Sequence, residues 1–174
     1  QGRETLNDTY QDDYFEVLPI ERLEVSGEIK LDSEDNNPNF LIAEEKATKA
    51  IQKHSMDIKD EERNPQIDEA FLLLGKARYF DERYIPALES FNYILNKYSE
   101  SDKLNEASIW REKVNIRLEN DDIAIKNLKR LMKYERLKDQ EYADARAMLA
   151  QAYINLNAPD TAVQNLKNAS HYTK

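Results

Sequence analysis

Apolar residues recur at helical spacing along most of this chain, and one short alanine-containing pattern occurs three times, at 69–77, 106–110 and 144–150. Each copy is followed by an alanine and, four positions later, by a large apolar residue. These pairs are Ala87 with Phe91, Ala124 with Leu128, and Ala162 with Leu166. The alanines lie 37 and 38 residues apart, close to the ~34-residue period of helix-turn-helix repeats. The pattern predicts an all-α solenoid of helical hairpins.

The same periodicity predicts seven helices separated by short polar turns. Their expected ranges are 39–55, 66–80, 84–98, 103–118, 121–134, 140–156 and 159–172. A polar stretch from 57 to 65 follows the first helix, and Pro159 stands where a first-turn proline is tolerated. Neighbouring helices are expected to meet at small residues, because axes ~8 to 10 Å apart leave no room for long side chains. These residues are Ala70, Ala87, Ala107, Ala124, Ala145 and Ala162.

Residues 1–37 differ from the rest of the chain because their apolar clusters have no sustained helical period. Pro19 opposes a continuous helix there, so an extended N-terminal arm is predicted, followed by a repeat domain over 38–174. The arm either packs along its own solenoid or serves as a tether or partner-binding strand. At the other end, the last predicted helix still presents Val163, Leu166 and Tyr172. Either the array continues past Lys174 or a partner covers this face, because solenoids normally close with a polar-faced helix.

Charge and composition narrow the class of partner. The 174 residues carry 25 Lys and Arg against 34 Asp and Glu, a formal charge of −9. That balance argues against nucleic acid or an anionic membrane as the main partner, although local basic faces remain compatible with it. No stretch approaches the ~20 apolar residues that span a bilayer. A secretory leader is also not visible, so any targeting segment has been removed or was never there.

Catalysis is not predicted, and neither is a cofactor or a metal site. With 3 glycines, 2 histidines and no cysteine, the chain composes no phosphate loop, thiolate site or catalytic triad. His54 follows an apolar stripe and is expected to be a packed or capping residue rather than a ligand. Residues 32–37 begin like a calcium loop but lack its glycine and its final glutamate. The acidic pairs, Asp121 and Asp122 among them, are expected in solvated turns.

The hairpin pattern resembles the tetratricopeptide repeat. The first copy is the best match, with Leu74 and Gly75 followed by Tyr84, Ala87 and Phe91. The third copy keeps Leu149, Ala150, Tyr153, Ala162 and Ala169. The second departs most, because Arg111 and Glu112 replace the leucine and glycine. Helix packing in the second hairpin is therefore the least secure part of the assignment.

Three long segments, 10–21, 43–56 and 64–80, show a narrower resemblance. They are similar to the N-terminal region of the tetratricopeptide-repeat lipoprotein of the Bacteroidota type IX secretion and gliding-motility machinery. The resemblance implies a non-enzymatic periplasmic scaffold, associated with the outer membrane through a lipidated cysteine upstream of Gln1. Its implied partners are the type IX translocon and associated periplasmic components, and residues 1–37 would link the lipid to the solenoid.

In this repeat architecture, the first helix of each hairpin lines the concave face, and its residues not used against neighbours point into the groove. The expected partner contacts on this face are Lys76, Tyr79, Phe80, Lys113, Arg117, Gln151 and Asn155. Tyr79 is the favoured anchor, since aromatic residues dominate interface hot spots. The alternative is that Tyr79 fills the gap between hairpins. An extended segment with apolar anchors and some acidic groups would complement this face.

Two other functions remain open at this point. The chain could be an accessory domain of a larger enzyme, whose catalytic part would lie beyond Lys174. It could also be a cytosolic co-chaperone that binds peptide tails. Fractionation of cells separates the second alternative from an envelope protein, and an activity search on the full-length product tests the first.

Overall fold

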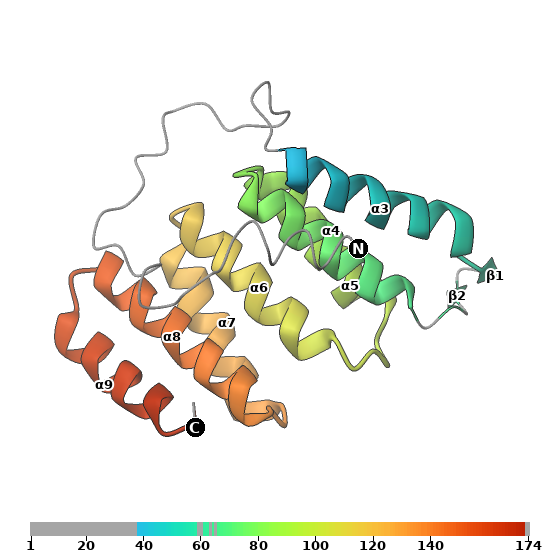
Figure 1. The fold of residues 1–174 in the computed structure, drawn as a ribbon. Coiled ribbons are helices and arrows are strands. Elements are labelled where there is room, and N and C mark those ends of the chain that lie inside the picture. Colours follow the sequence, from blue (N-terminus) through green and yellow to red (C-terminus); the bar gives the residue numbers. More distant parts are fainter. Residues whose placement is uncertain (1–37, 59–60, 63, 65, 173–174) are drawn as a thin grey trace. The chain divides into compact units, whose positions relative to one another are not determined.

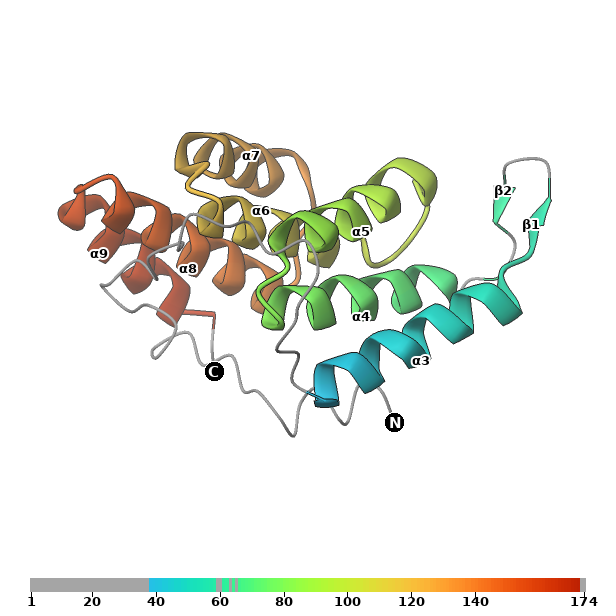
Figure 2. The same ribbon diagram turned by 90° about the horizontal axis from the view of Figure 1, so that it is seen from above.

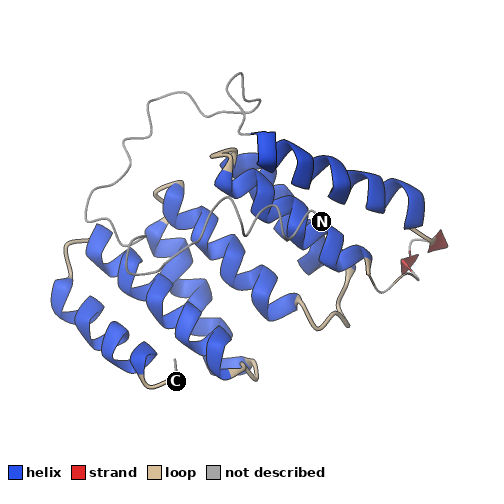
Figure 3. Cartoon of the chain, viewed as in Figure 1, coloured by secondary structure: helices blue, strands red, loops and turns tan. Residues whose placement is uncertain are grey.

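The computed structural model describes residues 38–58, 61–62, 64 and 66–172, and this part of the chain is helical (Figures 1 and 3). Its helices are α3 (Pro38–His54), α4 (Ile67–Phe80), α5 (Tyr84–Lys97), α6 (Leu104–Arg117), α7 (Asp121–Tyr134), α8 (Asp139–Asn155) and α9 (Pro159–Ser170). Their ends lie within two residues of the predicted ranges, so the all-α hairpin fold is confirmed. The predicted arm at 1–37 lies outside the described residues.

The polar stretch after α3 is more ordered than a simple break between helices. It contains two strands of two residues each, β1 (Asp57–Ile58) and β2 (Glu61–Glu62), which pair antiparallel with Asp57 opposite Glu62. A strand pair this short carries no alternating apolar pattern, so hydrophobic periodicity could not reveal it.

The turns inside the three hairpins have the same backbone geometry. One residue in each adopts a left-handed conformation: Glu82 with φ 60°, Glu119 with φ 62° and Asn157 with φ 57°. The next residue donates its backbone N–H to the carbonyl five positions earlier, at 2.9, 2.8 and 2.8 Å respectively. These bonds satisfy carbonyl groups that the end of a helix would otherwise leave unpaired. The left-handed residues are 37 and 38 positions apart, which confirms the register of the repeat.

The chain divides into two compact units, with the boundary between Ala107 and Ser108 inside α6. In the first unit, α4 packs against α3 on one side and α5 on the other (Figure 2). Gly75 allows the second contact, because a Cβ atom there would lie 2.5 Å from Cε1 of Phe91. The Phe91 ring is itself fully buried. On the α3 side, Phe40 and Ala43 pack with Ala77.

In the second unit, α6, α7 and α8 contribute to one apolar core, and α9 packs against α8. Nine buried side chains form this core: Ile109, Ile116, Ala124, Leu128, Ala145, Ala147, Met148, Leu149 and Ala152. The expected small-residue contacts are confirmed at five of six alanines, since Ala87, Ala107, Ala124, Ala145 and Ala162 are buried. The sixth, Ala70, is partly exposed. It borders a hollow of about 300 Å³ that residues from both ends of the α3–α4 connection also line.

The second hairpin replaces the close helix contact of the first with a buried polar cluster. Glu112 occupies the repeat position of Gly75 and is only 1% exposed. Its carboxylate accepts hydrogen bonds from Arg111 Nε at 2.6 Å, Asn115 Nδ2 at 2.8 Å and Asn127 Nδ2 at 3.1 Å. Leu128 occupies the repeat position of Phe91. A buried carboxylate is tolerated when hydrogen bonds replace its water shell, so this hairpin keeps the fold despite its divergent sequence.

Candidate binding face

The predicted partner contacts fall on the first helices of the hairpins, with three on α4 in the first unit. Lys76 is partly exposed, and its Nζ lies 2.6 Å from Glu106 Oε1. Tyr79 is only 4% exposed. Its ring meets the edges of Phe80 and Tyr84, with centroids 5.4 and 5.7 Å away. This burial favours the alternative in which Tyr79 packs within the helices, rather than acting as an open anchor.

Phe80 packs against α3, the helix that precedes the three repeated hairpins. Its ring stacks on Phe40 of α3, with centroids 6.0 Å apart and an angle of 25° between the planes. Helix α3 therefore lies against the side of α4 that carries Phe80. Of the three predicted contacts on α4, Lys76 is the one with a charged group, and its side chain is partly exposed.

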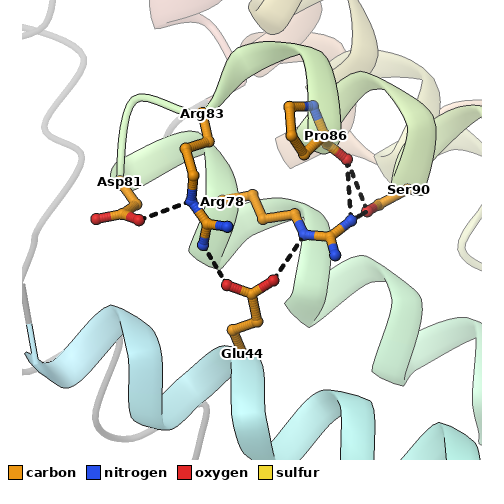
Figure 4. A network of polar contacts seen from close by, with 6 residues as sticks. All are labelled: Glu44, Arg78, Asp81, Arg83, Pro86 and Ser90. Atoms are coloured by element: carbon orange, nitrogen blue, oxygen red, sulfur yellow. Dashed lines mark hydrogen bonds and ion pairs between the residues drawn. The ribbon is translucent and has the colours of Figure 1, made fainter. Parts of the chain in front are cut away.

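An ionic network joins α3 to α4 and to the turn that follows it (Figure 4). Glu44 of α3 accepts a hydrogen bond from Arg78 Nε at 2.9 Å and pairs through its other oxygen with Arg83. Arg83 Nε also donates to Asp81 Oδ2 at 2.8 Å, and Arg78 reaches Ser90 Oγ at 3.0 Å. Burial raises the pKa of Glu44, but the hydrogen bonds from Arg83 and Arg78 lower it by more. The pKa in the folded protein is therefore below the ordinary 4.5. The network is structural, because it holds α3 in place.

Lys113 and Arg117 lie one turn apart on α6 in the second unit. Lys113 is only 4% exposed, and its Nζ lies 4.5 Å from the ring centroid of Trp110. Burial lowers the pKa of Lys113 to about 7, and the neighbouring Arg117 charge adds to this effect against the opposing influence of Asp144. Arg117 is partly exposed. Of these two cations, Arg117 is partly exposed and Lys113 is buried.

Gln151 and Asn155 form a short polar chain on α8. Gln151 Nε2 donates to Asn155 Oδ1 at 2.9 Å, and Asn155 Nδ2 donates to Asp121 Oδ1 at 2.8 Å. Asp121 is 2% exposed, so the prediction that it lies in a solvated turn is wrong. As the first residue of α7, it places a carboxylate where the helix dipole favours negative charge. The sequence predicted that a helix starts at Asp121. It did not predict the hydrogen bond from Asn155, which is 34 residues away in the chain.

The remaining candidates from the sequence have ordinary surroundings. The His54 side chain is exposed, so of the two expected roles, packed or capping, the packed one is wrong; His54 is the last residue of α3, where a basic side chain suits the helix end. Its backbone carbonyl accepts a hydrogen bond from Asn64 at 2.9 Å. Within the described ranges, no three His, Asp or Glu side chains gather as a metal site requires. The calcium-like residues 32–37 lie outside those ranges. Among the helices described, none combines the length and the apolar character needed to cross a membrane.

No protein-family model matches the chain, and no curated protein matches it either. The class that the structure defines is therefore that of all-α proteins built from repeated helical hairpins. Function has to be inferred from the surfaces of these hairpins.

Proposed function

We propose that this protein is a non-enzymatic scaffold that binds other proteins through the faces of its helical hairpins. The observation that carries the proposal is the repetition of one hairpin geometry, with the same left-handed turn at Glu82, Glu119 and Asn157. Repeated hairpins present extended surfaces rather than one closed cleft, and arrays of this kind bind partners along those surfaces. Lys76, Arg117, Gln151 and Asn155 are the predicted contacts whose polar side chains are partly exposed.

The finer part of the proposal concerns the place of action. The resemblance of 10–21, 43–56 and 64–80 to the type IX secretion lipoprotein supports a periplasmic adaptor associated with the outer membrane. In this role the protein connects the translocon to other components, and secretion and gliding depend on it. A lipidated cysteine upstream of Gln1 would supply its membrane contact, and no nucleic acid is involved.

Cell fractionation combined with gene deletion tests this proposal. The full-length product is expected in the outer-membrane fraction, released by detergent and not by salt. Deletion is expected to abolish secretion by the type IX pathway and gliding together, with recovery on complementation. Recovery of the protein in the soluble cytosol would instead favour the co-chaperone alternative. Unchanged secretion in the deletion strain would contradict the adaptor role.

The binding part has its own test on the hairpin surface. Substitution of Lys76, Arg117 and Gln151 by alanine is expected to reduce recovery of translocon components in a pull-down from envelope extracts. These side chains are partly exposed, so circular dichroism should show an unchanged helical content. The matched control changes Lys53, Gln164 and Lys167, which are exposed on α3 and α9, and removes the same charge. Equal recovery with both triple variants would exclude the predicted face.

A further inference from the structure

The outward side of α7 carries a row of cations on a protein that is acidic overall. Four basic side chains occupy one stripe of this helix and are all exposed: Lys126, Lys129, Arg130 and Lys133. The chain then adds Arg136 and Lys138, so residues 126–138 hold six basic side chains and one acidic one. The whole molecule has a formal charge of −9. Residues 126–138 therefore carry a local excess of positive charge on an acidic chain.

Two large apolar side chains stand beside the cations. Ile123 is 52% exposed and Tyr134 is 67% exposed, the latter more than any other large apolar side chain in the described residues. The ammonium group of Lys133 lies 4.8 Å from the centroid of the Tyr134 ring, and that of Lys129 lies 5.4 Å from Tyr153. Within the described part of the chain, no ion pair engages the four cations of the stripe. Their charge is available to a molecule from outside.

The opposite side of α7 is fully used by the fold. Ala124 and Leu128 are both buried in the core of the second unit, where they pack with residues of α6 and α8. Figure 2 shows α6 and α8 on the same side of α7 and no described helix of this unit on its other side. The apolar face of α7 is thus buried in the core, and the basic side chains of its other face are exposed.

We propose that this basic stripe docks an acidic segment of a protein partner, with Ile123 and Tyr134 contacting apolar residues near the ends of that segment. Opposite charges spread along one line complement a peptide segment and speed its association. A lipid surface fits less well, because a helix that lies in a membrane interface inserts its apolar face, and that face of α7 is buried. Nucleic acid is opposed by the net charge of the whole molecule. This inference rests on the scaffold role proposed above.

Binding of a defined acidic peptide tests the proposal. The probe is a fluorescein-labelled peptide of alternating glutamate and serine with Leu and Phe near its ends, titrated with the full chain. The double variant K126E/R130E is expected to weaken binding about tenfold, because two attractive contacts become repulsive. The control K53E/K167E changes the net charge equally at exposed sites on α3 and α9 and is expected to bind as the wild type.

Several outcomes would overturn the proposal. They are no binding of the acidic peptide, equal loss in both double variants, or equal affinity for a peptide with lysine in place of glutamate. Tighter binding of phosphatidylglycerol vesicles or of duplex DNA than of the peptide would assign the stripe to a membrane or to nucleic acid. Circular dichroism of both variants confirms that the comparison is made between folded proteins.

Cross-linking separates this inference from the scaffold role itself. The chain contains no cysteine, so R130C and K76C each accept one benzophenone label, and the cross-linked peptides are sequenced in envelope extracts. A partner peptide rich in Asp and Glu at position 130 is the expected result. A cross-link from position 76 alone would retain the scaffold and reject the α7 site. A cross-link to residues 1–37, which hold 11 acidic and 3 basic side chains, would assign the stripe to the chain itself.

Discussion

At the scale of single residues, Gly75 sets how closely α4 and α5 approach. A Cβ atom at this position would lie 2.5 Å from the Phe91 ring, so the ring or the helices would have to shift, and the ring is fully buried. The other hairpins combine a larger residue with a smaller partner, as Glu112 with Leu128 and Ala150 with Leu166. The size of the residue tolerated at position 75 therefore depends on the residue at position 91.

Gly75→Ala is expected to lower the free energy of unfolding by about 1 to 2 kcal/mol, since overpacking outweighs the higher helix propensity of alanine. In a Phe91→Leu background the ring is absent, and the same change is expected to be neutral or to stabilise by up to about 1 kcal/mol. Urea denaturation of the four proteins measures this coupling. An equal loss from Gly75→Ala in both backgrounds would contradict the contact.

The buried Lys113 is expected to make the free energy of unfolding depend on pH in a range where exposed lysines have no such effect. Burial lowers its pKa to about 7 in the folded protein, whereas the unfolded chain titrates near 10.5. Between these values the unfolded state binds more protons, so the free energy of unfolding rises with pH, by at most ~1.4 kcal/mol per pH unit. Lys113→Met is expected to be more stable at pH 7 and to remove this rise. Chemical denaturation at pH 7, 8 and 9 checks it, and parallel curves for both proteins would refute it.

At the scale of elements, the attachment of α3 depends on Glu44 as well as on apolar packing. The pKa of this carboxyl group is lowered in the folded state, because the hydrogen bonds from Arg83 and Arg78 outweigh the effect of burial. Its contribution to stability is therefore present above pH 4.5 and is lost as the pH falls through the lower folded value. The two arginines then lose their shared anion.

Glu44→Gln is expected to destabilise the protein at pH 7 and to flatten the loss of stability below pH 4.5. The expected cost is about 1 to 3 kcal/mol, because a partly buried charge pair is broken on one side. Thermal unfolding between pH 3 and 7 provides the measurement. Glu45→Gln is the matched control on the same helix, since Glu45 is exposed. Identical pH profiles for the two variants would argue against the network.

The alanine contacts between helices make a second prediction at this scale. Ala124 is completely buried where α7 meets its neighbours, whereas Ala70 borders the hollow of about 300 Å³. Ala124→Leu is expected to cost about 1 to 3 kcal/mol through overpacking. Ala70→Leu has space to accommodate the larger side chain and is expected to cost less than half as much. Melting temperatures that fall equally for both variants would contradict the assigned register.

At the scale of the whole molecule, the sequence predicted the hairpins well because their signals are local. Apolar spacing and the recurring alanines place the helix ends within two residues of those observed. The candidate site was less accessible to sequence reasoning. Helical periodicity identifies which residues share a face, but it does not reveal that α3 covers Phe80 or that Lys113 is enclosed. The Glu44 network joins residues up to 39 positions apart, and no spacing rule indicates such pairs.

The repeated turn geometry also bears on how the chain acquires its structure. Each turn at Glu82, Glu119 and Asn157 is closed by contacts between residues near in sequence, and local contacts form quickly. The polypeptide thus carries three similar nucleation points, and folding can begin at any of them and spread to adjacent helices. A destabilising substitution in one turn slows the folding pathway that begins there, but folding can still begin at the other two turns. Such a protein therefore tolerates substitutions within a single hairpin.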